Sequence, residues 1–143
     1  MGLNEKLILV CIHGNLSEVK KLVKNGTDIH MANDSPLRNA AGLGYLDVVK
    51  YLVESGANIH ADEGTPLINA VAHGHLEIVK YLVEHGADIH VNRDFPLRHA
   101  AIHSHLELAT YLRKVAGKKW KCYNCLVSPT CLKLCKGWNY GYK

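Results

Sequence analysis

Apolar residues recur at helical spacing in pairs of segments along most of the chain. In one pair, Leu67, Ala70 and Val71 share one face of a short helix that opens at Pro66, where the fixed φ of proline suits the first turn. The longer apolar stripe of the second helix begins at about His75 and comprises Leu76, Val79, Leu82 and Val83. Glycines at 74 and 86 are suited to end the two helices. The pattern predicts a helical hairpin followed by a connector, with Thr65 as the N-cap of the first helix.

This hairpin pattern repeats every 30 residues. Segments 36–60, 66–90 and 96–117 align without a gap, and each begins with a proline. Segment 6–30 is a looser copy without the proline. A hairpin of this size cannot bury both of its faces alone, so we expect the copies to stack. The small side chains of Ala40, Ala70 and Ala100 allow neighbouring first helices to approach closely.

The fold class that follows is all-α, a solenoid of four helical hairpins with short extended β-turn connectors and a Cys-rich C-terminal tail. One connector, Ala87 to Phe95, contains Ile89 and Val91 between polar turn-forming residues. This composition is typical of an extended segment that turns sharply outward. His75 and His105 begin second helices, and we expect them to hydrogen-bond to the adjoining loop.

The repeat resembles the ankyrin repeat. The family's T-P-L-H-x-A motif appears as Thr65 to Ala70, its G-H-L motif begins at Gly74, and its G-A-D-I-N motif appears as Gly86 to His90. The resemblance covers 3–116 and implies an ankyrin-repeat domain there, followed by a basic, aromatic, Cys-rich tail at 117–143. The repeats would span about 3–32, 33–62, 63–92 and 93–116. The usual period is 33, so this chain is similar to the shortened type common in giant DNA viruses, and its connector fingers should be trimmed.

Charge divides the chain into the same two parts. The formal net charge is +4, but the tail at 117–143 holds six lysines and no acid, which leaves a net charge of −2 for the rest. The first ten residues lack the features of a secretory signal, and no apolar run is long enough to span a membrane. We therefore expect a cytoplasmic protein, in the host-cell cytoplasm if the source is viral, with the nucleus as the alternative.

The ten histidines invite a catalytic or metal-binding interpretation, but the repeat argues against it. His30, His60 and His90 are one full unit apart, so stacking separates them by about 10 Å, too far to share one ion. Cys11 lies in a small-residue core position, where a buried inert thiol is expected rather than a nucleophile. We find no catalytic residues and predict that the chain is not an enzyme.

The ankyrin resemblance implies a protein partner on the concave surface formed by connectors and first helices. His13, His73 and His103 share one position there with Leu43. The partner-binding residues that we predict are Asn33, Asp34, Arg38, Leu43, Asp62, Glu63, Ile68, His73, Arg93, Phe95, Arg98 and His103. Competing roles remain open, because Phe95 can pack inward and the two arginines can pair with Asp34 and Asp94.

The tail has three interpretations. Four thiols in C-x2-C-x5-C-x3-C spacing suit a tetrahedral zinc site, although the central gap is shorter than usual; they belong to Cys122, Cys125, Cys131 and Cys135. The lysines and aromatic residues could instead form a strip that attracts nucleic acid or an anionic membrane. The third interpretation is a capping or flexible extension whose Trp120, Leu126 and Leu132 fold against the last repeat.

Together these observations favour a non-catalytic protein–protein interaction module, an adaptor or scaffold. We expect a monomer that binds another protein and neither nucleic acid nor a membrane, with no cofactor. The alternative is a tail-driven protein that binds zinc, nucleic acid or a membrane, with the repeats as its platform.

Overall fold

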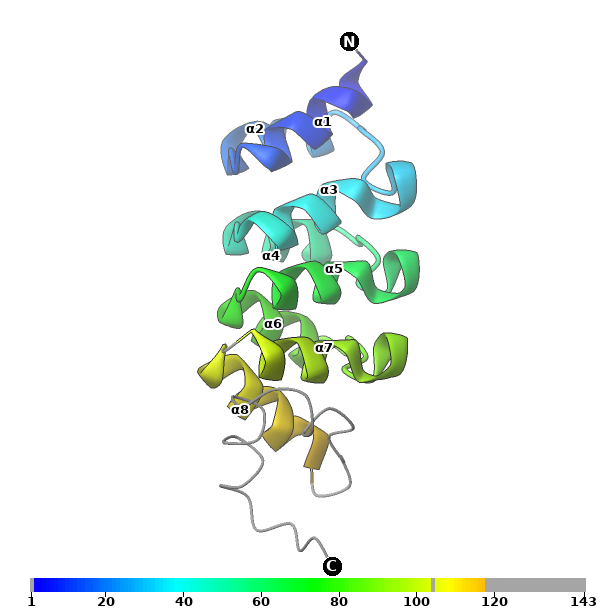
Figure 1. The fold of residues 1–143 in the computed structure, drawn as a ribbon. Coiled ribbons are helices and arrows are strands. Elements are labelled where there is room, and N and C mark those ends of the chain that lie inside the picture. The colour runs from blue at the N-terminus through cyan, green and yellow to red at the C-terminus, as the bar shows by residue number, and fades with distance from the viewer. Residues whose placement is uncertain (1, 104, 118–143) are drawn as a thin grey trace, which may run out of the picture. The chain divides into compact units, whose positions relative to one another are not determined.

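The computed structural model describes residues 2–103 and 105–117, and these residues form helices joined by short turns (Figure 1). In chain order the helices are α1 (Leu3–Ile12), α2 (Leu16–Lys24), α3 (Met31–Leu43), α4 (Leu46–Glu54), α5 (Ala61–Ala72), α6 (Leu76–Glu84), α7 (Val91–Ile102) and α8 (Leu106–Ala116). No β-strand occurs in these two described ranges. The predicted all-α architecture of successive helical hairpins is confirmed. No described helix is both long enough and apolar enough to cross a membrane.

The chain divides into two compact units between Asp88 and Ile89. In the first unit, α1, α3 and α5 pack side by side in one layer, and α2, α4 and α6 pack in a second layer (Figure 1). We call these the inner and outer layers. The second unit contains the hairpin of α7 and α8, which pack against each other.

The core lies between the two helices of each hairpin, as the apolar stripes predict. Leu7, Leu37 and Leu67 occupy equivalent positions on the first helices and are fully or almost fully buried. The second helices bury the next set of equivalent residues, which comprises Val19, Val49, Val79, Leu22, Leu52 and Leu82. Ala40 and Ala70 are also fully buried, which fits their predicted role in the close packing of neighbouring first helices.

The loop between the two helices of one repeat is covered by the next repeat. Gly44 has φ +88°, and a Cβ placed on it would lie 2.6 Å from Cε1 of His75. His75 Nε2 donates a hydrogen bond to the carbonyl oxygen of Gly42 at 3.0 Å. His75 was expected to bond to the adjoining loop, and its bond instead reaches the last turn of α3, just before the loop of the preceding repeat. One repeat earlier, a Cβ placed on Gly14 would lie 2.5 Å from ring carbons of Tyr45.

The connectors adopt a conformation that the sequence did not indicate. Ala32, Asn33 and Asp34 have φ values of 48°, 56° and 53°, and equivalent residues at 62–64 and 92–94 are also left-handed. The backbone N–H of Asp34 closes this turn on the carbonyl oxygen of His30 at 3.2 Å. A 30-residue unit has three residues fewer than usual for a projecting finger, and a left-handed turn reverses the chain within this short length. It costs roughly 1–2 kcal/mol for each non-glycine residue, so packing must hold it in place.

The predicted cap of the first helix also differs. Thr65 was expected to accept a hydrogen bond from the helix N-terminus. Its hydroxyl instead donates to the carbonyl oxygen of Asp62 at 2.6 Å, and it lies 3.2 Å from Asp62 Oδ2. Thr65 thus stabilises the left-handed turn that precedes it.

Candidate partner-binding site

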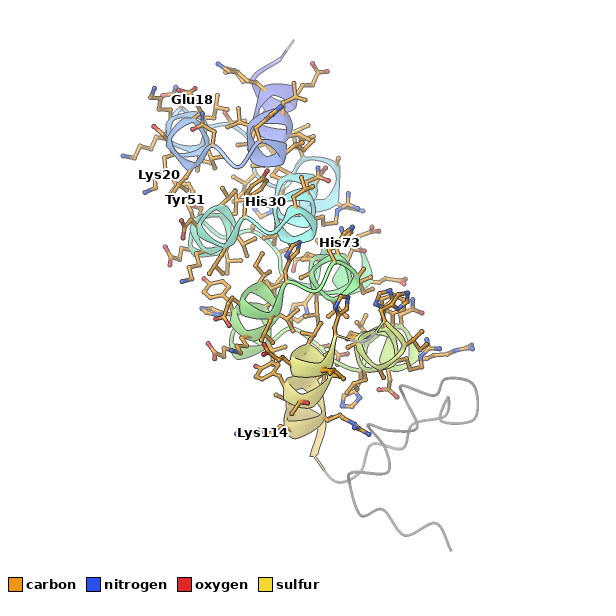
Figure 2. All side chains as sticks on the ribbon, turned by 60° about the vertical axis from the view of Figure 1, so that its left-hand side comes forward. Glu18, Lys20, His30, Tyr51, His73 and Lys114 are labelled. Carbon is orange, nitrogen blue, oxygen red and sulfur yellow. The ribbon has the colours of Figure 1, made fainter. Side chains whose placement is uncertain are left out.

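The predicted site residues fall into both units. The first unit holds the residues on and beside α3 and α5, and the second holds three residues on α7 and His103 directly after it. Figure 2 shows the two faces of the first unit, with His73 on the inner layer and Lys20 and Tyr51 on the outer layer. We call the exposed side of α1, α3 and α5, with the connectors that lead into them, the inner face.

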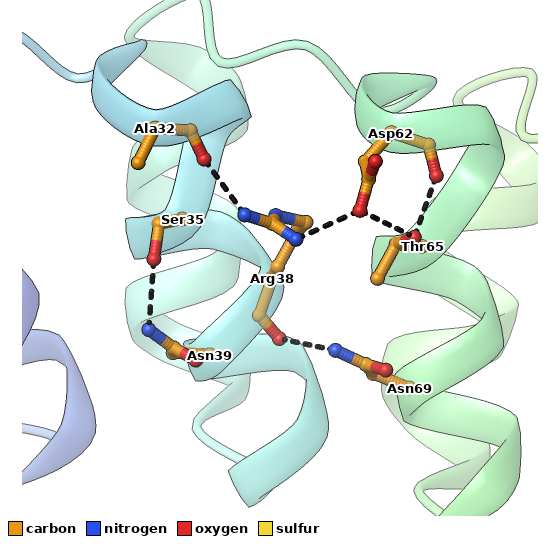
Figure 3. A network of polar contacts seen from close by, with 7 residues as sticks. All are labelled: Ala32, Ser35, Arg38, Asn39, Asp62, Thr65 and Asn69. Atoms are coloured by element: carbon orange, nitrogen blue, oxygen red, sulfur yellow. Dashed lines mark hydrogen bonds and ion pairs between the residues drawn. The ribbon is translucent and has the colours of Figure 1, made fainter.

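Arg38 and Asp62 link two neighbouring repeats on the inner face. Arg38 Nη1 lies 2.8 Å from Asp62 Oδ2, and Arg38 Nη2 donates to the carbonyl oxygen of Ala32 at 2.7 Å (Figure 3). The amide of Asn69 adds a second bond between the repeats, because its Nδ2 donates to the backbone carbonyl oxygen of Arg38 at 3.2 Å. The carboxylate partner of Arg38 is therefore Asp62, and not Asp34 as one interpretation of the sequence had it. Only 23% of the Arg38 side chain is exposed, so the main role of this ion pair is to hold the two repeats together.

Asp34 lies inside the fold. Its side chain is 7% exposed, and its Oδ1 accepts a hydrogen bond from the backbone N–H of Asn58 at 2.8 Å. The same oxygen lies 3.0 Å from Nδ1 of His30. Asp34 was predicted to contact a partner, but its carboxylate instead ties the start of α3 to the following connector. Asn4 makes the equivalent bond one repeat earlier, where its Oδ1 accepts from the N–H of Asp28 at 3.3 Å.

The other predicted residues of the first unit reach the surface to different degrees. Asn33, Glu63 and His73 are exposed, and Asp62 is 48% exposed in its side chain. Leu43 is 49% exposed, which is high for a leucine, and Ile68 is half-buried. These residues are available for contact on the inner face.

Two exposed apolar residues of this face were not predicted. Leu9 and Ile12 on α1 are 41% and 37% exposed. The sequence contained a signal for Leu9, because the next two repeats carry Asn39 and Asn69 at its position. A leucine in place of these amides indicates an apolar surface at that point.

Two histidines on the inner face have a fixed hydrogen-bonding pattern. His13 Nδ1 donates to the carbonyl oxygen of Leu9 at 2.6 Å, and His73 Nδ1 donates to that of Asn69 at 2.9 Å. A carbonyl oxygen can only accept, so Nδ1 carries the proton in each ring. In the neutral imidazole, Nε2 is then an acceptor that remains for another molecule.

The second unit presents a row of rings along α7. The ring of Phe95 lies 5.1 Å from that of His99, which stacks on His103 at 3.8 Å between ring centroids. Phe95 is half-buried and His103 is exposed. Arg98 Nη2 donates to the carbonyl oxygen of Asn92 at 3.4 Å rather than to Asp94, and Asp94 pairs with His90. Arg93 is exposed on the connector.

The structure gives no support for chemistry at Cys11. Its side chain is fully buried, and desolvation raises the pKa of the thiol to about 12. The thiolate is the reactive form of cysteine, so this residue is a poor nucleophile at neutral pH. Residues 2–103 and 105–117 contain no group of three side chains that could hold a metal ion. The proposed zinc ligands Cys122, Cys125, Cys131 and Cys135 lie outside the described residues.

Comparison with known proteins identifies the repeat. The family model for ankyrin repeats (3 copies) matches residues 5–63 and 60–124. No curated protein matches the chain. Because the family model covers most of the sequence and the observed hairpins agree with it, the chain belongs to the ankyrin-repeat family.

Proposed function

We propose that this chain is a non-catalytic adaptor or scaffold that binds a protein partner on its inner face. Ankyrin repeats are generally protein–protein interaction modules. The observation that carries the proposal is the set of inner-face residues that are exposed although the scaffold does not require them. Leu43 is the clearest case, because His13 and His73 occupy its position in the neighbouring repeats.

The test compares two surfaces of the same protein. One variant carries Leu43→Ser, Glu63→Ala, Ile68→Ser and His73→Ala on the inner face. Its matched control carries Lys24→Ala, Lys50→Ala, Glu54→Ala and Glu84→Ala on the outer layer. Circular dichroism and thermal melting establish that both variants fold.

The partner is first isolated by affinity capture on the full chain, and its affinity for each purified variant is then measured by titration calorimetry. We expect the inner-face variant to bind at least tenfold more weakly, because residues at the centre of an interface carry most of the binding energy. We expect the outer-layer variant to bind as the unmodified chain does. Loss of binding in the outer-layer variant alone would overturn the proposal.

The tail supplies the alternative function, and metal analysis distinguishes the two. One zinc per chain, lost when Cys122 and Cys125 are replaced by serine, would favour the tail-driven alternative. Partner binding that survives the inner-face substitutions but is lost in the cysteine variant would establish it.

A further inference from the structure

The inner face of the first unit carries an apolar patch at its first two helices. It comprises Leu9 and Ile12 on α1 and Leu43 on α3, all between 37% and 49% exposed. Leu9 and Ile12 are three residues apart and share one side of α1. The patch extends across both helices, because α1 packs directly against α3.

Repeat equivalence indicates how Ile12 and Leu43 lie between α1 and α3. Gly42 is the counterpart of Ile12, and a Cβ on Gly42 would lie 3.3 Å from Cβ of Asn69 on the next first helix. Ile12 therefore leans toward α3. Leu43 lies one position after Gly42, about 100° further round α3, which turns its side chain back toward α1.

The scaffold does not explain this patch. The other repeats of the first unit carry Asn39 and Asn69 in place of Leu9, and Gly42 and Ala72 in place of Ile12. Repeats that carry these small or polar residues also stack on their neighbours, so the fold does not require larger apolar side chains at these positions. Burial of the three larger side chains by a partner would remove the exposed apolar surface from water.

The surroundings of the patch favour a partner with hydrogen-bond donors and positive charge. His13 and His73 lie on either side of Leu43 in the repeat series, and each offers an Nε2 acceptor when neutral. The inner face of the first unit also carries the exposed carboxylate of Glu63 at the start of α5, whereas the positive charge of Arg38 is neutralised by Asp62.

The net charge of the first unit is also consistent with a positively charged partner. Residues 1–88 contain seven basic and eleven acidic residues, a formal net charge of −4. Five of the six lysines lie on the outer layer, where Lys21 pairs with Glu18 and Lys80 with Glu77. The remaining lysine, Lys6, lies at the start of α1, where its charge acts on Glu18 of α2.

We propose that the patch of Leu9, Ile12 and Leu43 binds an apolar side chain from a partner segment that also carries lysine or arginine. The inference rests on the proposed function and specifies the chemistry of the partner. The apolar side chain inserts between α1 and α3, while the flanking basic groups donate to His13 and His73 and approach Glu63.

The chain itself supplies a matched variant for the test. Leu9→Asn, Ile12→Ala and Leu43→His together give the patch the residues that equivalent positions carry elsewhere in the repeat series. Because these residues already occur in folded repeats of the same chain, the variant should keep its fold. Leu106→Gln serves as the control, because Leu106 on α8 is 54% exposed and lies outside the patch.

Random 12-residue peptides displayed on phage are selected on the full chain after removal of those that bind the triple variant. This step discards peptides that bind the basic tail. The surviving peptides are synthesised, and their dissociation constants are measured by titration calorimetry at low and high salt.

We expect the selected peptides to combine leucine, isoleucine, phenylalanine or tryptophan with lysine or arginine. Their affinity should fall at least tenfold in the triple variant and remain unchanged in Leu106→Gln. Glu63→Gln should weaken binding a few-fold at low salt and less at high salt, because salt screens exposed charges.

Two outcomes would overturn the inference. A predominantly acidic consensus would show that the charge assignment is wrong, while leaving the inner face as the binding surface. If no peptide discriminates between the chain and the triple variant, the patch is not a binding site. The partner captured on the full chain decides the proposed function separately. If its affinity falls in the four-residue inner-face variant and is unchanged in the triple variant, the inner face is the binding surface but the patch is not part of it.

Discussion

The carboxylate of Asp34 is the most constrained polar group in the connectors. It accepts from the N–H of Asn58 and lies beside His30 in a position that is almost closed to solvent. We expect Asp34→Ala to lower the free energy of unfolding by about 1–3 kcal/mol, because the Asn58 N–H loses its acceptor. Urea denaturation provides the measurement.

Asp34→Asn is the matched control for this residue. Its amide oxygen can still accept a hydrogen bond from the N–H of Asn58, so the free energy of unfolding should fall less than in the alanine variant. A change of less than about 0.5 kcal/mol in Asp34→Ala, the range of ordinary surface substitutions, would show that the bond contributes little.

Cys11 provides a second prediction at the level of single residues. With Cys122, Cys125, Cys131 and Cys135 replaced by serine, Cys11 is the one remaining thiol. Burial raises its pKa to about 12, so the native thiol stays protonated at pH 8. We expect no reaction with a thiol-specific chromogenic disulfide in native buffer, and one equivalent per chain in urea. Rapid reaction of the folded protein would mean that Cys11 is accessible.

At the level of the helical elements, the loop glycines differ in what surrounds them. Gly44 and Gly56 both have positive φ, but a Cβ on Gly44 meets His75 whereas a Cβ on Gly56 meets nothing within 4 Å. We expect Gly56→Ala to cost about 1 kcal/mol from backbone strain alone. Gly44→Ala should cost more, because His75 must move and its bond to Gly42 is lost.

Thermal and urea unfolding of both variants measure the difference. The extra cost at Gly44 should shrink in the presence of His75→Ala, since the clashing ring is then absent. Equal costs at Gly44 and Gly56 with His75 intact would show that the next repeat does not close over the loop.

The helical hairpins could be predicted from the sequence because their signals are local. The positions of Pro66, Gly74 and Gly86 mark where helices begin or end, and the apolar spacing marks their buried faces. The left-handed turns could not be predicted in this way. Gly64 is the only glycine among the nine positions. Asn and Asp occupy several of the others and adopt positive φ more readily than most residues, but they are just as common in ordinary turns.

The site was predictable in part. Exposure of Leu43 and His73 followed from their place in the repeat. The burial of Asp34 and the pairing of Arg38 with Asp62 depend on contacts between residues 24 apart, which the pattern of one repeat does not reveal. Leu9 and Ile12 differ from the residues at their positions in the other copies, but an apolar residue on a first helix is equally compatible with burial, so their exposure could not be predicted.

At the level of the whole molecule, the division at Asp88 predicts local differences in stability. Leu97 is buried in the second unit, and Leu97→Ala should destabilise its surroundings by about 2–5 kcal/mol. Repeat proteins are stabilised by nearest-neighbour contacts. We therefore expect hydrogen exchange to accelerate in α7 and α8 while α1 to α4 keep their protection. Mass spectrometry of peptic fragments measures the exchange rates of both groups of helices. Equal acceleration in all of them would show that the helices unfold as one cooperative unit.

Equivalent contacts between successive repeats have the same offset. Lys20 lies over the ring of Tyr51, and Lys50 lies over that of Tyr81, each 31 residues further along the chain. If residues 31–60 were deleted, Lys20 would meet Tyr81, the equivalent of its present partner. The gene can therefore gain or lose whole repeats of thirty codons and keep equivalent partners opposite one another, whereas an insertion of another length would displace the partners of each contact that spans it.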